Sequence, residues 1–223
     1  MGEREGFIRK AIVLLVLGLA PVAGAQIKSS LTLRDTTSPI QAPALSATVL
    51  SADPNSTVVS VDIGSAESWD GWPDASNWVG LVDIGSATGL GSAAVVNGVG
   101  WDVTIETVGS SCFSDCLIYL DDAVSPDGDG LAFPPGPDAT SGTGTYGSSG
   151  IMDLTDNGVA DIPLPDGWLR IEMVEAIDDF PDAIDARYLS GSVLYVSVHP
   201  EPATVVLLGL GIAGMAARRR PPR

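Results

Sequence analysis

The sequence predicts an all-β fold: an antiparallel β-sandwich with jelly-roll connections, flanked by an N-terminal signal peptide and a C-terminal hydrophobic helix. Apolar residues recur at every second position in short segments, which is the pattern of half-buried strands. No segment between them has the helical period that the crossover helices of a parallel α/β fold would need. The alternating segments are Leu45-Ala47-Val49, Val59-Val61-Ile63, Trp101-Val103-Ile105, Leu169-Ile171-Met173 and Leu194-Val196-Val198.

Clusters of turn-forming residues separate the predicted strands. A longer stretch, residues 131–150, contains four prolines or glycines in a row and then many Ser, Thr and Gly residues, which predicts a long mobile loop. The shorter turn signals are Asp53-Pro54-Asn55, Asn97-Gly98, Ser125-Pro126-Asp127-Gly128, Asp156-Asn157-Gly158 and Pro165-Asp166-Gly167.

The N-terminus has the three parts of a secretory signal peptide. Basic residues precede an apolar run over residues 11–22, and Ala23-Gly24-Ala25 provides the small residues of a signal-peptidase site. Residues 1–25 are therefore expected to be removed by signal peptidase, which leaves Gln26 as the mature N-terminus. A retained N-terminal membrane helix is the alternative, but Pro21 interrupts an already short apolar run.

The C-terminal segment, residues 199–223, also has three parts. Each proline of Pro200-Glu201-Pro202 fixes φ near −65° and lacks an N–H, so this tripeptide is expected to stand outside any strand or helix. The fifteen apolar residues 203–217 would form a transmembrane helix of roughly 22 Å, shorter than a hydrocarbon core of about 30 Å and hence a poor permanent anchor. Arg218, Arg219 and Arg220 are expected to remain on the cytoplasmic side.

This order of motif, apolar stretch and arginine cluster resembles the PEP-CTERM sorting signal, a bacterial family also known as the ice-binding-protein C-terminal domain. The resemblance implies cleavage near Pro-Glu-Pro by an exosortase, a membrane-embedded cysteine transpeptidase of bacteria that make exopolysaccharide. It implies no ice-binding activity in the rest of the chain. An ordinary C-terminal membrane anchor is the alternative interpretation. Most of residues 95–198 also resemble the β-rich ectodomains that precede this tail, a resemblance that carries no assigned activity. It is clearest in Gly100-Trp101-Asp102-Val103-Thr104-Ile105 and in Asp166-Gly167-Trp168-Leu169-Arg170-Ile171-Glu172.

The predicted ectodomain, residues 26–198, is strongly acidic. Residues 26–197 contain four basic and 25 acidic residues, which gives a net charge of −21. This charge argues against nucleic acid and anionic lipid head groups as partners, because both attract positive charge. Of the acidic residues 21 are Asp, whose short side chain bonds its own backbone in turns.

Cys112 and Cys116 are the two cysteines of the chain. In an exported protein they predict a disulfide that closes a small loop. Because the loop is so short, its entropic contribution to stability is expected to be modest.

Aspartate-rich segments supply the oxygen ligands that Ca²⁺ prefers. The preferred candidates for a calcium site are Asp127 with Asp129, and Asp178 with Asp179, although neither pair has the spacing of an EF-hand. The alternative is that these residues are solvated turns. Calcium is therefore the one cofactor that the sequence suggests.

Trp69, Trp72 and Trp78 lie within ten residues of a polar, turn-rich segment. Exposed indole rings beside Asp and Asn side chains would form a platform on which a sugar ring stacks. The alternative is that the rings fold back and cap one end of the sandwich core.

The sequence gives little support for an enzyme. The single histidine, His199, lies in the tail, so no Ser-His-Asp or Cys-His arrangement can form in the ectodomain. We therefore expect a non-enzymatic structural or adhesive role at the cell surface or in the exopolysaccharide matrix. The alternatives are a carbohydrate-binding module, with or without calcium, and an exported glycan hydrolase, for which the sequence offers no preferred carboxylate pair.

Overall fold

The computed structural model describes residues 44–52, 56–124, 126, 130–179 and 183–201. The predicted signal peptide 1–25 and transmembrane helix 203–217 lie outside the described residues, as do Pro202, Asp127 and Asp129 and the arginines 218–220. Among the described residues, no helix is long and apolar enough to cross a membrane.

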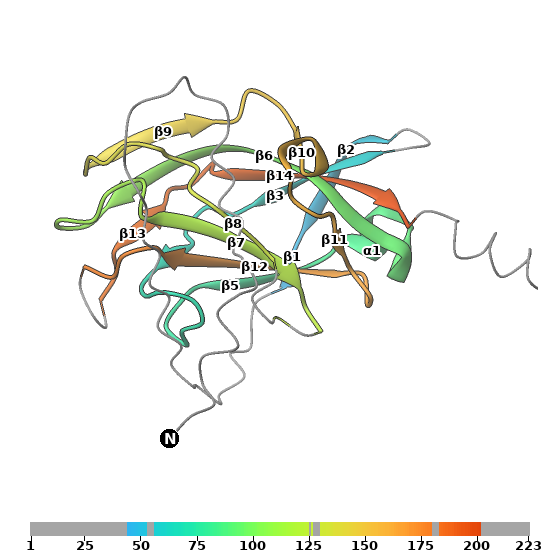
Figure 1. Cartoon of the computed structure of the whole chain (residues 1–223), viewed down its shortest axis with the longest axis horizontal. Coiled ribbons are helices and arrows are strands. Elements are labelled where there is room, and N and C mark those ends of the chain that lie inside the picture. Colours follow the sequence, from blue (N-terminus) through green and yellow to red (C-terminus); the bar gives the residue numbers. More distant parts are fainter. Residues whose placement is uncertain (1–43, 53–55, 125, 127–129, 180–182, 202–223) are drawn as a thin grey trace, which may run out of the picture.

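Two β-sheets pack face to face, which confirms the predicted sandwich (Figure 1). The smaller sheet has five strands, and all its neighbouring pairs are antiparallel except the short parallel pair of β1 with β5. The order across this sheet is β1 (Ala44–Leu45), β5 (Val79–Asp83), β12 (Trp168–Glu175), β7 (Cys116–Asp122) and β8 (Leu131–Phe133).

The larger sheet has nine strands and is built around β6 (Ala94–Thr107). The main order is β2 (Ala47–Ala52), β3 (Thr57–Asp62), β14 (Val193–Pro200), β6, β13 (Ala186–Tyr188) and β4 (Glu67–Ser68). Three further strands pair with β6: β9 (Thr143–Gly147), β10 (Met152–Asp153) and β11 (Ile162–Pro163). The helical elements are α1 (Ile84–Thr88), η1 (Gly91–Ala93) and η2 (Thr155–Asn157).

The core lies between the sheets and consists of the inward-facing residues of both. On β6, Trp101, Val103 and Ile105 are buried, whereas Asp102 between them is exposed, as the period of two requires. The Trp101 ring packs against Phe133 of the opposite sheet at 4.8 Å between centroids, and its Nε1 donates to the Pro135 carbonyl at 3.1 Å. This indole therefore ties the two sheets together.

Four of the five predicted alternating segments are confirmed as strands whose apolar residues are all buried. The first segment differs, because Val49 on the edge strand β2 is 43% exposed. The predicted turn at Asn97-Gly98 is wrong. Both residues lie inside β6, where Gly98 pairs with Ser197 on one side and Asp153 on the other. Here tertiary pairing overrides a local turn signal.

The prediction of one long loop over residues 131–150 is also wrong, because β8 and β9 lie within it. Phe133 of β8 is fully buried in the core. Tyr146 of β9 packs against Phe113 and donates to Asp138 at 3.0 Å. Glycine and serine are frequent in this stretch, but the contacts of Phe133 and Tyr146 attach it to the sandwich.

Many aspartates lie in turns and accept hydrogen bonds from nearby backbone N–H groups, as the sequence predicted. Asp83 caps α1 by accepting from the Ser86 N–H at 2.8 Å. The Asp153 carboxylate accepts from the Asp156 N–H and from Thr155, and these bonds lower its pKa. Much of the acidic composition therefore builds turns.

The structure contains no disulfide between Cys112 and Cys116, contrary to the sequence prediction. Cys116 begins β7 and is buried in the core, whereas Cys112 is half-buried in the preceding loop. A tight turn separates them, with the Asp115 N–H donating to the Cys112 carbonyl at 3.1 Å and the Cys116 N–H to the Phe113 carbonyl at 3.3 Å. The Cys116 thiol donates to the Cys112 carbonyl at 3.3 Å and the Cys112 thiol lies 3.9 Å from the Ser110 carbonyl. The turn thus places the two thiols in different environments.

The different burial of two paired valines, one on β3 and one on β2, predicts how much each contributes to stability. Val59 is fully buried and Val49, its partner across the strand pair, is 43% exposed. Val59→Ala should lower the free energy of unfolding by about 2 kcal/mol, because it removes two buried methyl groups and leaves a cavity. Val49→Ala is the matched control and should change it by less than about 0.5 kcal/mol. Denaturant unfolding measures both, and equal losses would contradict the assigned burial.

The cysteine geometry gives a second prediction, that both residues are free thiols. In the folded protein, a thiol-alkylating reagent should modify Cys112 and spare Cys116, since burial raises the pKa of the Cys116 thiol far above its usual range and excludes the reagent. Denaturation without reductant should then expose both cysteines, which intact mass detects. The Cys112→Ser variant should lose the native-state label. A denatured, unreduced protein that takes no label would contain the disulfide and contradict the structure.

Candidate functional site

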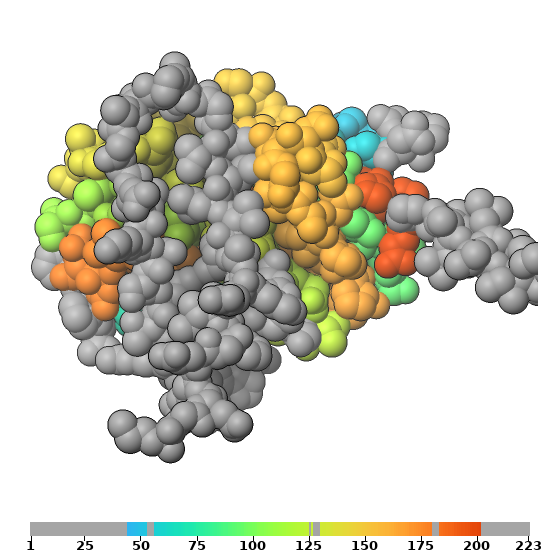
Figure 2. Space-filling model, viewed as in Figure 1, coloured from blue at the N-terminus to red at the C-terminus, as the bar shows by residue number. Residues whose placement is uncertain are grey.

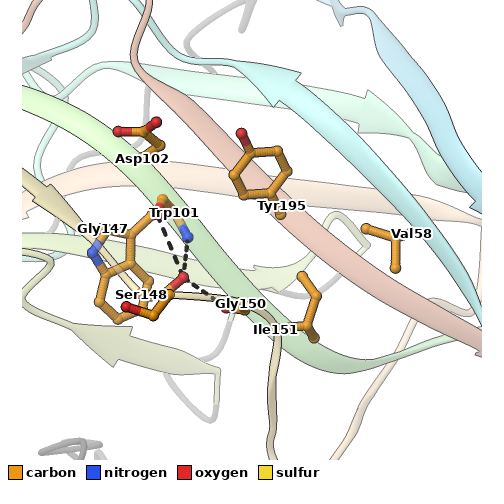
Figure 3. Close-up of a pocket in the computed structure, with 9 residues that line it drawn as sticks. Val58, Trp101, Asp102, Gly147, Ser148, Gly150, Ile151 and Tyr195 are labelled. Atoms are coloured by element: carbon orange, nitrogen blue, oxygen red, sulfur yellow. Dashed lines mark hydrogen bonds between the residues drawn. The ribbon is translucent and has the colours of Figure 1, made fainter.

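An open groove of about 490 Å³ lies on the outer face of the larger sheet (Figure 3). Its walls come from β3, β6 and β14 and from the segment that follows β9. The lining residues are Val58, Trp101, Asp102, Gly147, Ser148, Ser149, Gly150, Ile151 and Tyr195. The groove is therefore lined by residues that are far apart in the sequence.

Tyr195 is the aromatic residue on the outer face of β14 within this groove. Its partners on the two neighbouring strands are Gly100 of β6 and Ser60 of β3. Because both partners are small, neither covers the tyrosine ring. The half-buried ring, the apolar Val58 and Ile151 and the exposed carboxylate of Asp102 surround the same opening.

The opposite wall is fixed to β6 through Ser148. Its hydroxyl accepts from the Trp101 N–H at 2.9 Å and donates to the Gly150 carbonyl at 2.7 Å, as Figure 3 shows. Close packing over β6 requires glycine there, since a Cβ at Gly100 would lie 2.6 Å from the Gly150 oxygen, and one at Gly98 would lie 2.8 Å from Ile151. Gly98 and Gly100 of β6 therefore allow the backbone of this wall to pack directly on the central strand.

The predicted tryptophan platform is folded onto the sandwich. Trp72 packs at 5.4 Å from Tyr119 on the outer face of the smaller sheet, and Trp78 packs against the main core. Asn77 fixes this segment by accepting from the Trp69 and Asp70 N–H groups and by donating to Glu172 of β12 at 3.2 Å. All three tryptophans are half-buried. Trp72 and Trp78 therefore fold back onto the sandwich, as the alternative to a sugar platform expected, but Trp72 covers a sheet face rather than one end of the core.

The aspartates predicted as calcium ligands fall into two groups. Asp127 and Asp129 lie outside the described residues. Asp178 and Asp179 are exposed in the segment after β12. In the described part of the chain, no group of three or more His, Cys, Asp or Glu side chains is placed so that it could hold a metal ion.

Three carboxylates lie close to Asp178 and Asp179: Asp185, which belongs to the same aspartate-rich segment of the sequence, and Asp115 and Glu175, which sequence reasoning missed. Burial raises the pKa of Glu175 well above its usual range, and repulsion from Asp185, Asp115 and Asp179 adds to this. Burial likewise raises the pKa of Asp185 to about 6, with Asp178, Asp179 and Asp115 contributing. Glu175 was hidden in the sequence because it ends an apolar strand rather than lying in an aspartate-rich turn.

The first residues of the predicted sorting motif are attached to the sandwich. Pro200 is the last residue of β14 and pairs with Ala94 of β6, which corrects the expectation that the tripeptide stands outside every strand. A proline fits there because it ends the strand and need not donate to the ladder. The Glu201 N–H donates to the Ala93 carbonyl at 2.7 Å.

The residue before the motif, His199, adds a further contact. Its Nε2 lies 3.2 Å from the Asp161 carboxylate, just before β11. Figure 2 shows the gold segment that includes β11 beside the red end of β14. The tail therefore starts directly from the folded sandwich, with no linker before Pro200.

Comparisons with known proteins identify the C-terminal segment. A search of curated proteins finds no significant match. A family model of the PEP-CTERM protein-sorting motif matches residues 200–220, which begin where β14 ends. The chain thus carries the PEP-CTERM sorting signal of an exosortase substrate, a protein that is exported and sorted to the cell surface.

Proposed function

We propose that the mature protein is a non-enzymatic structural or adhesive component of the cell surface or the exopolysaccharide matrix. The observation that carries this proposal is the sorting motif joined without a linker to the central strand pair of an acidic sandwich. Signal peptidase would release the N-terminus at Gln26, and the helix 203–217 would hold the precursor in the membrane until exosortase acts. Because processing near Pro200 removes only residues beyond β14, the sandwich stays whole.

The motif makes processing testable. Mature protein from an exosortase-containing host should begin at Gln26 and end between Pro200 and Ala203, as measured by intact mass. Replacing all three residues of Pro200-Glu201-Pro202 by Ala should leave an uncut precursor in the membrane fraction. The matched control is His199→Ala, which removes the contact with Asp161 but leaves the motif intact and should still be cut. Mature protein that retains Arg218–Arg220 in such a host would contradict the proposal.

The connectivity that we propose for the sandwich is a jelly roll. Eight strands support it, in chain order β3, β5, β6, β7, β8, β9, β12 and β14. In the larger sheet the first, eighth, third and sixth of these lie side by side, and in the smaller sheet the second, seventh, fourth and fifth. Apart from β7 and β8, successive strands of this set alternate between the sheets, as two interlocked Greek keys require.

Carbohydrate recognition is the second candidate function, and the groove at Tyr195 favours it over the tryptophan segment. An uncovered aromatic face matches the apolar face of a sugar ring, while Asp102 and the hydroxyls of Ser148 and Ser149 offer hydrogen bonds. The volume of about 490 Å³ lies within the range of small-ligand sites. An exopolysaccharide is the ligand class that fits the location of the protein.

Tyr195 and Trp72 give a matched pair of substitutions for this candidate. On a glycan array, Tyr195→Ala should weaken any binding about fivefold or more, because a stacking contact of this kind contributes on the order of 1 kcal/mol or more. Trp72→Ala should leave binding unchanged, since its ring packs on Tyr119 rather than in the groove. The reverse result would place recognition at the tryptophan segment. Sugar release by the wild-type protein would instead indicate a glycan hydrolase.

A further inference from the structure

Five carboxylates gather at one end of the sandwich: Asp115, Glu175, Asp178, Asp179 and Asp185. Backbone contacts place the segments that carry them side by side. Cys116 of β7 pairs with Glu175, and the Ala176 N–H donates to the Asp115 carbonyl at 2.8 Å. We name this group the carboxylate cluster.

Glu175 and Asp185 form the buried part of the carboxylate cluster, and Ser68 connects them. The Ser68 hydroxyl donates to Glu175 Oε1, and the Ser68 carbonyl accepts from the Asp185 N–H at 2.9 Å. Asp185 Oδ1 accepts from the Ser111 hydroxyl at 2.8 Å. Glu175 is 1% exposed and Asp185 is fully buried. Each carboxylate nevertheless keeps one buried oxygen, Glu175 Oε2 and Asp185 Oδ2, without a hydrogen-bond partner.

Among the residues that the structure describes, no Lys or Arg balances the carboxylate cluster. Between residues 35 and 217 the sequence contains only two basic residues, Arg170 and Arg187. Arg170 pairs with Glu172, and Arg187 pairs with Glu67 and Glu106, so both are engaged elsewhere. Buried carboxylates without a counter-charge strongly oppose folding unless a proton or a cation neutralises them.

A third buried oxygen without a partner lies in the same region. The Tyr188 hydroxyl is fully buried and unpaired, and Glu175 is one of the groups whose charge acts on it. Three unsatisfied oxygens near one another are unusual for a protein interior, where nearly all buried polar groups find a partner. A bound ion would supply the missing partner.

We propose that the carboxylate cluster binds Ca²⁺, with Glu175 Oε2 and Asp185 Oδ2 as the buried ligands and the carboxylates of Asp115, Asp178 and Asp179 closing over the ion. Ca²⁺ accepts six to eight oxygen ligands in flexible geometry, whereas Mg²⁺ demands a near-ideal octahedron. The side chains are not arranged as a ready site, so the exposed Asp178 and Asp179 must move inward when the ion binds. Binding therefore brings the carboxylates of Asp178 and Asp179 against the buried pair and stabilises the fold.

The experiment measures the melting temperature of the exported, processed protein in millimolar CaCl₂ and in NaCl and MgCl₂ of matched ionic strength. Calcium at about a hundredfold excess over Kd should raise the melting temperature by about 5–10 °C above the value in the other salts, and chelation should reverse the rise. Equal melting temperatures in calcium and sodium would show charge screening alone and overturn the proposal. An equal rise in magnesium would overturn the assignment to calcium.

Two neutral isosteres test the position of the ion. Glu175→Gln and Asp185→Asn should each melt at a higher temperature than wild type in chelator, because a buried charge is removed, and should lose the response to calcium. Asp178→Asn with Asp179→Asn changes exposed residues only and should weaken calcium binding about tenfold by titration calorimetry. Because it removes some repulsion, it should also raise the melting temperature in chelator, but by less than the substitutions of the buried pair. The matched control is Asp156→Asn, an exposed acid in η2 that should keep the full response. An unchanged calcium response in Glu175→Gln and Asp185→Asn would overturn the site.

Discussion

The pairing of β6 with β14 is the interaction on which the rest of the structure depends. These strands form the centre of the larger sheet and contribute Trp101 and Leu194, paired side by side, to the core. β14 is also the last described strand, so the fold can close only after the whole ectodomain has been made. The sorting motif starts at Pro200, the final residue of β14. The site of export processing therefore directly follows the strand that completes the sandwich.

The period of two predicted the fold class because the segments it found place their apolar residues on one face, toward the core. Val59, Val61 and Ile63 alternate with polar or half-buried neighbours, and this pattern is local. The sequence pattern did not predict β7, because this strand is buried on both faces. All residues from Cys116 to Asp121 are buried, with Leu117 and Tyr119 covered by a second apolar cluster, so the strand shows no alternation. Asn97-Gly98 lies within a strand rather than a turn because Gly98 pairs with residues far away in the sequence.

The candidate sites were less predictable, because they depend on which segments meet in space. Trp69, Trp72 and Trp78 were selected by their density in the sequence, yet packing holds the rings of Trp72 and Trp78 against the sandwich. Tyr195 carries no sequence signal, and its ring is accessible only because Gly100 and Ser60 flank it across the strands. A cluster of similar residues in the sequence therefore does not by itself predict a binding surface. Whether a side chain is accessible depends on which residues the fold places beside it.

β6 also relates the carboxylate cluster to the tail. Its first residue, Ala94, pairs with Pro200 at the start of the sorting signal. The other end leads to Val108, whose N–H donates to the Asp185 carbonyl at 2.7 Å. A fourteen-residue strand spans up to about 45 Å, so the tail and the carboxylate cluster lie toward opposite ends of the sandwich. A chain held in the membrane by its tail would present the carboxylate cluster away from the bilayer, where cations of the surroundings reach it before the exosortase has cut.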